Sequence, residues 1–267
     1  MGFDWEIFFK YAWPPTAFQN PLIVTGLQAT LVISIGAQLL GVVLGLVFAL
    51  AQMSKFRAFR MIAQFYITYF RGTPALVQLS LIYFGLAAMH VYDFPDLILH
   101  GFRFRGIIQA AILGLGVSEG AYMTEIIRAG IISVHSSQME AAKSLGMTYA
   151  LGMRRIVLPQ ALRVIIPPTG NEFNNMFKAS TLTVNIGAIE LFNAFEQINA
   201  VYFQPFELFL AASVYYLAIT ITWGFVQSWL EKRFGDKVAA HKEPGLLSRL
   251  LKGGISLRRK GVGKYEG

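Results

Sequence analysis

The sequence predicts an all-α membrane protein with about five transmembrane helices, and three observations support this fold class. Of its 267 residues, 55% are hydrophobic and 14% are charged. The mean hydropathy of +0.50 lies outside the usual range for a soluble domain. Long apolar stretches recur along the chain, and a helix needs about 20 such residues to cross a bilayer.

Five apolar stretches are long enough to count as candidate spans. They cover residues 22–53, 74–91, 106–132, 161–182 and 206–230. An amphipathic segment, 61–70, precedes the second stretch. The fourth contains Pro167 and Pro168 together with charged residues, so an alternative count splits it or makes it re-enter the membrane.

Basic residues set the expected orientation, because Lys and Arg in short loops are retained on the cytoplasmic side. They gather after the first, third and fifth stretches and are sparse in the other loops. We therefore expect the N-terminus outside and the C-terminus inside. The predicted organisation is an outer segment 1–21, a transmembrane domain 22–230 with a cytoplasmic loop 140–159, and a flexible basic tail 231–267.

The net charge of +8 arises mostly from the tail, which predicts contact with anionic lipid headgroups and no nucleic-acid partner. No basic segment precedes the first apolar stretch, so we expect no cleaved signal peptide. The chain has no cysteine, no phosphate-binding loop and no metal-spaced cluster among its four histidines. We therefore expect no enzymatic activity and no cofactor bound by this chain.

A polar island at 140–159, EAAKSLGMTYALGMRRIVLP, stands between the apolar stretches. Good helix formers precede Gly146, which permits a turn, and a second helical run is expected to end at Pro159. Small side chains would let a partner approach the backbone, and the charges would orient it. The candidate contact residues are Glu140, Ala141, Ala142, Gly146, Arg154 and Arg155. The alternative is a solvated helical hairpin with no partner.

The third apolar stretch carries ionisable side chains, each of which costs roughly 2.5 to 3.5 kcal/mol at the centre of a bilayer. Ser118, Tyr122 and Glu125 share one helical stripe. Arg128 lies one turn beyond Glu125, which predicts an ion pair that orients the helix. Glu119 lies deeper and has no local partner, so we expect it and Ser118 near a solute path.

The fourth stretch is richer in polar residues. Asn171, Asn175 and Lys178 share a stripe, and Glu172 lies beside it. A carboxylate and amides facing one cavity would suit a zwitterionic solute. The alternative is a polar seam between helices or subunits.

Two further patterns predict packing. Gly41 with Gly45, and Gly116 with Gly120, are spaced to let helices approach closely. Arg71 lies beside the start of the second stretch and is expected to extend to the lipid headgroups.

Several motifs together resemble the polar amino acid uptake permeases of bacterial ABC importers. They are RGTPALVQL at 71–79, AYMTEIIRAGI at 121–131, the Glu-Ala-Ala loop at 140–159, LPQALR at 158–163 and PPTGNEF at 167–173. The chain departs from that pattern at 136–137 and 178–182. The resemblance implies the type I importer permease fold in a bacterial inner membrane, a solute cavity that includes Asn171 and Glu172, and a loop at 140–159 that docks on an ATPase.

The same resemblance implies the partners. They are two ATPase subunits that bind ATP and Mg, a second permease forming a homodimer or heterodimer, and a periplasmic or lipid-anchored solute-binding protein. The solute would be a polar amino acid or a related compound such as an opine. Two other hypotheses stay open: a secondary transporter coupled to protons through Glu119, Glu125 and Glu172, and a membrane scaffold without transport.

Overall fold

The computed structural model describes residues 3–99 and 102–234, and this part of the chain is almost entirely helical, which confirms the predicted all-α class. The elements are α1 (Trp5–Ala12), α2 (Pro14–Ala17), α3 (Pro21–Gln52), α4 (Arg57–Gly72), α5 (Ala75–Ser80), the π-helix η1 (Leu81–Gly85), α6 (Leu86–Ala88), β1 (Leu97–Leu99), β2 (Phe102–Phe104), α7 (Gly106–Ile132), α8 (Ser136–Ser144), α9 (Tyr149–Gly152), the π-helix η2 (Met153–Val157), α10 (Leu158–Ala179), the 3₁₀-helix η3 (Ser180–Ile186), α11 (Leu191–Tyr202) and α12 (Pro205–Phe234). Most of the predicted basic tail, from 235 onward, lies outside the described residues.

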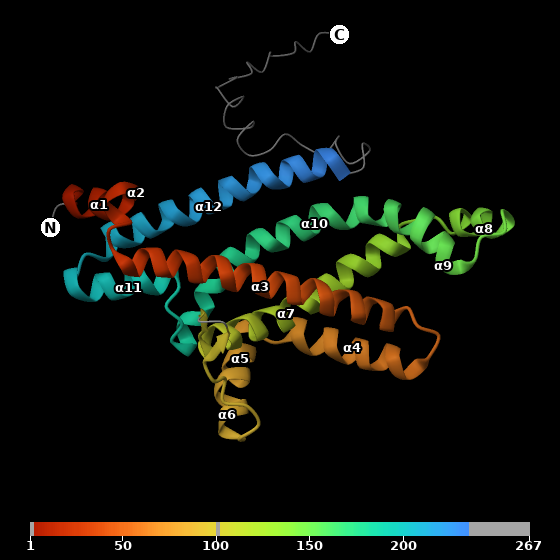
Figure 1. Ribbon diagram of the computed structural model, residues 1–267, viewed down its shortest axis with the longest axis horizontal. Coiled ribbons are helices and arrows are strands. Elements are labelled where there is room, and N and C mark those ends of the chain that lie inside the picture. Colours follow the sequence, from red (N-terminus) through yellow and green to blue (C-terminus); the bar gives the residue numbers. More distant parts are fainter. Residues whose placement is uncertain (1–2, 100–101, 235–267) are drawn as a thin grey trace, which may run out of the picture.

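Four long helices form the body of the molecule (Figure 1). Helices α3, α7, α10 and α12 run along its long axis and pack on one another. Helices α8 and α9 lie at one end, while α1, α2 and α11 lie at the opposite end. Helices α5 and α6 project from the side of this bundle.

Three described helices are long and apolar enough to cross a membrane, which confirms a membrane-spanning protein. They are α3, α7 and α12, which contain 18-residue segments with mean hydropathies of 2.4, 1.2 and 1.7. A shorter apolar helical segment, Ala75–Ala88, lies at the predicted second stretch, and α10 occupies the fourth. The count of five spans and the orientation stay predictions.

Helix α10 fills most of the predicted fourth stretch as a single helix. It continues through Pro167 and Pro168, so the alternative that splits this stretch is wrong for the helix itself. Thr169 Oγ1 donates to Ile165 O (2.9 Å) in the same turn. Such side-chain bonds help a membrane helix to tolerate proline.

The expected stop at Pro159 is also wrong. The wide turn of η2 leads directly into α10, with Leu158 N donating to Met153 O, five residues earlier. Pro159 then lies in the first turn of α10, where its missing N–H is tolerated. A π-turn therefore carries the chain from the polar island into the fourth helix without a break.

The paired glycines bring α3 and α7 into close contact, as predicted. A Cβ atom on Gly41 would lie 2.5 Å from Glu119 Cγ, and one on Gly45 would lie 2.4 Å from Met123 Cβ. On α7, a Cβ atom on Gly120 would lie 2.8 Å from Leu44 Cβ of α3. Contacts this short exclude any larger side chain, so these glycines set the separation of the two helices.

The segment before α3 is folded, which the sequence did not predict. Asp4 caps α1 by accepting from the N–H groups of Glu6 and Ile7 (3.0 and 3.1 Å). The N–H of Asp4 itself donates to Glu207 Oε1 (2.9 Å) at the start of α12. Helix α1 therefore packs on α12 near its N-terminal end.

A short antiparallel hairpin, β1–β2, precedes α7 and is also absent from the prediction. Its register pairs Leu97 with Phe104. Strands of three residues give too short an alternating pattern to be recognised in an apolar sequence.

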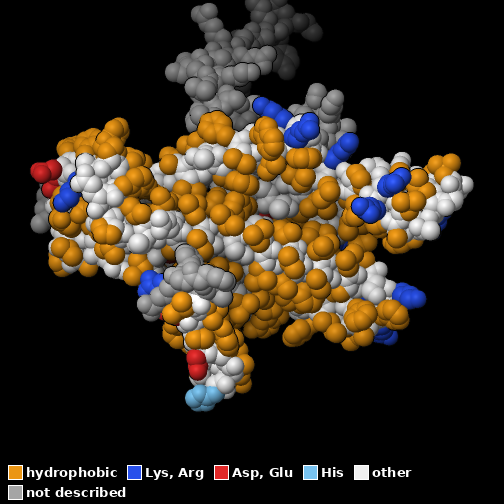
Figure 2. Space-filling view, in the orientation of Figure 1, with side chains coloured by type: hydrophobic (Ala, Val, Ile, Leu, Met, Phe, Trp, Pro, Cys, Tyr) orange, Lys and Arg blue, Asp and Glu red, His pale blue; other side chains and the backbone are white. Residues whose placement is uncertain are grey.

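Large apolar side chains cover the outside of the bundle (Figure 2). Leu39 on α3, Phe65 on α4 and Phe225 on α12 are 63%, 73% and 73% exposed. Most of the visible Lys and Arg side chains gather toward the end that carries α8, α9 and the start of α4. An apolar surface of this extent fits contact with lipid or another subunit.

Candidate functional site

The polar island folds as helix, glycine turn and helix, as predicted. Gly146 has φ +77°, in the left-handed region. Its N–H donates to Lys143 O (2.9 Å), and Met147 N donates to Ala142 O (3.1 Å). These two bonds define a Schellman motif that ends α8. Thr148 Oγ1 then accepts from Leu151 N (3.4 Å) and caps α9.

The island has a buried side and an exposed side. Ala142 is 3% exposed, and a Cβ atom on Gly152 would lie 3.3 Å from its Cβ. Ala142 therefore lets α8 and α9 pack together, whereas Ala141 is exposed and open to a partner. The predicted charged residues Glu140, Arg154 and Arg155 are exposed as well.

Two apolar residues extend this exposed side, and sequence reasoning missed them. Leu145 and Tyr149, on either side of the Gly146 turn, are 79% and 60% exposed. They lie at the junction of α8 and α9, the two short helices at one end of the bundle (Figure 1). Exposed apolar residues among charges are typical of a protein contact surface.

Glu125 on α7 lies at the centre of a small charged group. Arg128 Nη2 is 3.8 Å from Glu125 Oε2, and Arg71 Nη1 is 3.5 Å from the same atom. The Arg71 guanidinium also lies over the Tyr122 ring, 5.4 Å from its centroid. Arg71 thus has a partner that the sequence did not indicate, because the end of α4 packs against α7 and places Arg71 beside a carboxylate. Its extension to the lipid headgroups stays a prediction.

The predicted solute-path residues of α7 are buried. Ser118 is 8% exposed and Glu119 is 5% exposed. Glu119 packs against Gly41 of α3 and lies within electrostatic range of Glu172 on α10. The structure thus brings the carboxyl groups of Glu119 and Glu172 near one another from two different helices.

Some of the polar groups of α10 bind α12, and others are exposed on the surface. Gln227 Nε2 donates to Asn171 Oδ1 (3.1 Å), and Trp223 Nε1 donates to Gly170 O (2.8 Å). Asn171 and Asn175 are exposed, and Glu172 is half-buried. Within residues 3–99 and 102–234, no hydrogen bond or ion pair engages the Glu172 carboxylate.

A buried carboxylate that sequence reasoning missed fixes the opposite end of the bundle. Glu190 is fully buried and accepts from Asn193 N (2.8 Å), Phe192 N (3.0 Å), Tyr216 OH (2.7 Å) and Thr30 Oγ1 (3.3 Å). Burial raises the pKa of this carboxyl, and its four hydrogen bonds act in the opposite direction. An acidic residue just before a helical run is a helix-capping signal that could have identified it.

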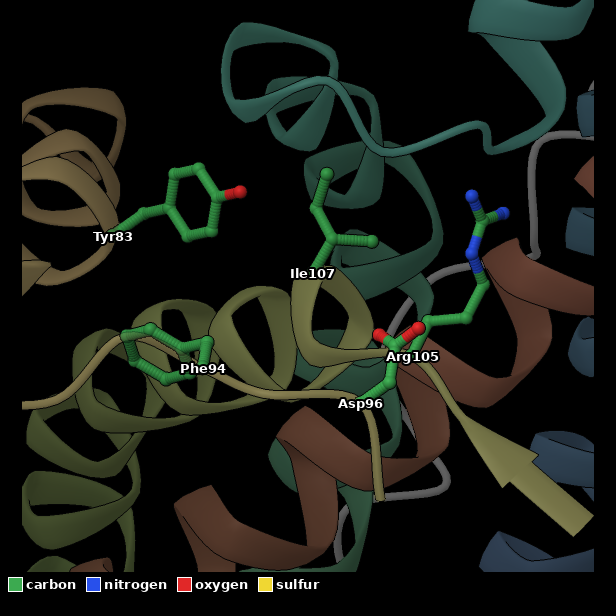
Figure 3. Close-up of a pocket in the computed structure, with 5 residues that line it drawn as sticks. All are labelled: Tyr83, Phe94, Asp96, Arg105 and Ile107. Carbon is green, nitrogen blue, oxygen red and sulfur yellow. The ribbon is translucent and has the colours of Figure 1, made fainter. Parts of the chain in front are cut away.

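A cavity of about 390 Å³ lies beside the start of α7 (Figure 3). Tyr83 and Phe94 line one side, Asp96 and Arg105 line the other, and Ile107 lies between them. Asp96 Oδ1 accepts from Gly106 N (2.7 Å) and so also caps α7. The cavity lies toward the end of α7 opposite α8.

In the part of the chain that the structure describes, no group of three or more His, Cys, Asp or Glu residues could hold a metal ion. The candidate site comprises the exposed side of α8 and α9 together with the polar faces of α7 and α10.

Comparison with known proteins identifies the family. Residues 41–236 match the family described as binding-protein-dependent transport system inner membrane component. The chain is 37% identical over 238 residues to the arginine transport system permease protein ArgU of Corynebacterium glutamicum, covering 87% of this chain and 72% of that protein. It is 35% identical over 229 residues to the probable amino-acid permease protein YxeN of Bacillus subtilis, covering 86% and 95%.

Solved structures show the same fold. The crystal structure of an amino acid ABC transporter with histidines superposes with a TM-score of 0.74 at 36% identity, covering 87% of this chain and all of that chain. A methionine ABC transporter, MetNI, in an inward-facing conformation gives a TM-score of 0.63 at 18% identity over 80% of this chain and 97% of that one, which shows the fold alone. The chain is thus an inner-membrane protein that belongs to the binding-protein-dependent transport system inner membrane component family, among its amino-acid ABC transporter permeases.

Proposed function

We propose that this chain is the permease subunit of an ATP-driven importer that carries polar amino acids, or related compounds such as opines, into the cytoplasm. The relatives include permeases named for arginine, glutamine and cystine transport, which supports a polar amino acid as the solute class. ATP and Mg belong to a separate ATPase. The complex would hold two ATPase subunits, a second permease and a solute-binding protein outside the membrane.

The exposed side of α8 and α9 is the observation that carries the proposal. The Gly146 turn presents Leu145 and Tyr149 among the charges of Glu140 and Arg154, at one end of the bundle. Because η2 continues directly into α10, a displacement of α8 and α9 would be transmitted to α10. An ATPase that docks here could therefore drive alternating access.

The solute path is proposed to run beside α10. Glu172 is half-buried without a hydrogen bond or ion pair among the described residues, so its carboxylate can meet a solute ammonium. Asn171 and Asn175 are exposed next to it and can donate to or accept from a solute. Ser118 and Glu119 on α7 would support this path from the buried side.

The proposal is tested by reconstituting the chain in liposomes with the ATPase and solute-binding protein encoded beside it, and measuring ATP-dependent uptake of labelled amino acids. Glu140→Lys should abolish uptake and weaken co-purification of the ATPase while the chain still inserts into the membrane. Glu6→Lys is the matched control, because it makes the same charge change at an exposed position on α1, and it should retain uptake.

Two outcomes would contradict the proposal. Uptake by the purified chain alone, driven by a proton gradient without the ATPase, would support the secondary transporter. An assembled complex that shows no ATP-dependent uptake of any labelled amino acid would support the scaffold.

A further inference from the structure

Helix α1 has three distinct faces, although it is only 8 residues long. Residues four positions apart lie on one side of a helix, and successive residues are rotated by about 100°. The three pairs with this spacing differ in character: one faces the protein, one is exposed and charged, and one is exposed and aromatic. In that order they are Ile7 with Tyr11, Glu6 with Lys10, and Trp5 with Phe9.

The protein-facing pair holds α1 against α12. Tyr11 is 4% exposed and belongs to one apolar cluster with Leu208 and Ala211 of α12. The hydrogen bond from Asp4 N to Glu207 Oε1 (2.9 Å) places the start of α1 beside the start of α12. This docking fixes the directions in which the other two faces of α1 point.

The described residues leave most of the aromatic face open. Trp5 and Phe9 are 63% and 55% exposed, and their rings stack with 5.8 Å between centroids. Trp13, four residues beyond Phe9, continues this aromatic row and is 61% exposed. Three large exposed rings on one side of a short segment are typical of a contact surface. The aromatic row therefore needs a partner outside the described residues.

The position of the aromatic row favours the membrane as that partner. Helices α1 and α2 lie at the end of the bundle where α3 and α12 begin, and both of these helices are long and apolar enough to cross a bilayer (Figure 1). The row is also continuous with the apolar surface of α12. Phe206 at the start of α12 is 68% exposed, and the Phe3 ring lies 5.7 Å from its ring and 4.5 Å from that of Trp5. Trp side chains are enriched where such helices meet the lipid headgroups.

The charged face distinguishes a helix at the membrane surface from one inside the hydrocarbon. Glu6 and Lys10 are exposed and rotated by about 100° from Trp5 and Phe9. Lys10 Nζ donates to Tyr202 OH (3.2 Å) on α11, which holds the ammonium group at this level. A helix with one aromatic and one charged exposed face is suited to lie between acyl chains and water.

We propose that α1 lies in the headgroup layer of the bilayer, at the end of the bundle opposite α8 and α9. The aromatic row of Trp5, Phe9 and Trp13 contacts the upper part of the acyl chains. Glu6 and Lys10 face water. The partner of this surface is the lipid itself, and not a second permease or a solute-binding protein. Because α1 is docked on α12, it sets the depth at which α12 enters the bilayer.

Site-directed spin labelling tests this placement, because the chain has no cysteine and a single one can be introduced. The full chain is purified with the subunits that remain bound and is placed in lipid nanodiscs. Collisions of the label are measured with oxygen, which concentrates in lipid, and with a water-soluble nickel chelate. The ratio of oxygen to nickel collisions should be several-fold higher for a label at Phe9→Cys than for one at Glu6→Cys. The latter is the matched control on the same helix.

Two results of this experiment would overturn the proposal. Equal ratios for the two labels would show that the aromatic row is in water. A label at Phe9→Cys that neither reagent reaches would show that a protein subunit covers the row.

Tryptophan fluorescence gives a second test that serves if Phe9→Cys does not fold. In nanodiscs with phospholipids brominated near the headgroup, Trp5 and Trp13 should be quenched, so the variant Trp5→Phe/Trp13→Phe should lose part of the quenched emission. Phospholipids brominated at the ends of the acyl chains are the control and should quench these two residues less. Equal quenched emission in the variant and the wild type would disprove the lipid contact. Neither measurement needs transport, so these results stand apart from those that test the proposed function.

Discussion

Arg71, in the last turn of α4, and Glu125, in the C-terminal third of α7, form an ion pair with 3.5 Å between Nη1 and Oε2. The same carboxylate oxygen lies 3.8 Å from Arg128 Nη2, so one negative charge serves two guanidinium groups. Arg71 adds a cation–π contact with Tyr122. This group therefore ties α4 to the helix that carries the buried Glu119.

Replacement of Glu125 by Gln should leave both arginines without a carboxylate. The two ion pairs are partly exposed, with side-chain exposures of 33% to 43%, so we expect a loss of only about 1 kcal/mol. The thermal unfolding midpoint of the detergent-solubilised chain should fall by about 2–4 °C. Arg57→Gln, at the exposed start of α4, is the control and should change the midpoint little. Equal effects of the two variants would show that the group contributes nothing.

Substitution of Gly146 by Ala should damage the turn between α8 and α9 through the backbone alone. Nothing lies within 4 Å of a Cβ atom at this position, but its φ of +77° costs roughly 1–2 kcal/mol for an L-residue. We expect reduced ATP-dependent uptake and weaker ATPase co-purification. The control is Gly224→Ala in α12, which also has open space around Cβ but has no positive φ. If both variants transport equally, the turn geometry is not required for coupling.

Removal of the Glu190 carboxylate should destabilise the end of the bundle that holds α11. Glu190→Ala leaves buried donors of Thr30, Tyr216 and the first turn of α11 without an acceptor, at roughly 3 kcal/mol. Glu190→Gln retains an oxygen and should recover part of this stability. Gln197→Ala, exposed on the same helix, should stay within about 0.5 kcal/mol. A thermal unfolding midpoint of Glu190→Ala equal to that of Gln197→Ala would disprove the role of this carboxylate.

Neutralisation of Glu172 should weaken solute recognition. Loss of one charge-assisted hydrogen bond to an ammonium group corresponds to about 1.5–3 kcal/mol, so Glu172→Gln should raise the KM for uptake at least about tenfold. Basal ATP hydrolysis by the complex should not change. Glu196→Gln, a half-buried carboxylate on α11, is the matched control. An unchanged KM in Glu172→Gln would remove this residue from the solute path.

Much of the fold follows from local properties of the sequence. The apolar stretch 106–132 coincides with α7, and 22–53 differs from α3 by one residue at each end, because hydrophobicity over about 20 residues is a strong signal. The Gly146 turn was predictable because a left-handed residue at a helix end favours glycine. The spacing of Gly41 and Gly45 predicted close helix packing, because small residues four positions apart lie on one face of a helix.

The errors occur where distant residues decide the outcome. Pro159 was expected to end a helix, but a π-turn carries the chain into α10. Pro167 left a split fourth span open as an alternative, but α10 continues through it. The ion pair of Arg71 with Glu125 was also not predicted, because only the packing of α4 on α7 brings the two residues within reach. The structural role of Glu190 was not predicted, because its partners Thr30 and Tyr216 lie on helices that are distant in the sequence.

Local properties of the sequence are enough to identify a helical membrane protein, and the ordered motifs predicted the family. Hydrophobic length, glycine spacing and helix-breaking residues act over a few turns, so they can be recognised without coordinates. Which polar side chains meet becomes visible only in the folded chain. Glu119 is buried where α7 packs on α3, within electrostatic range of Glu172 on α10, because contacts between helices depend on rotation and separation that no local pattern encodes.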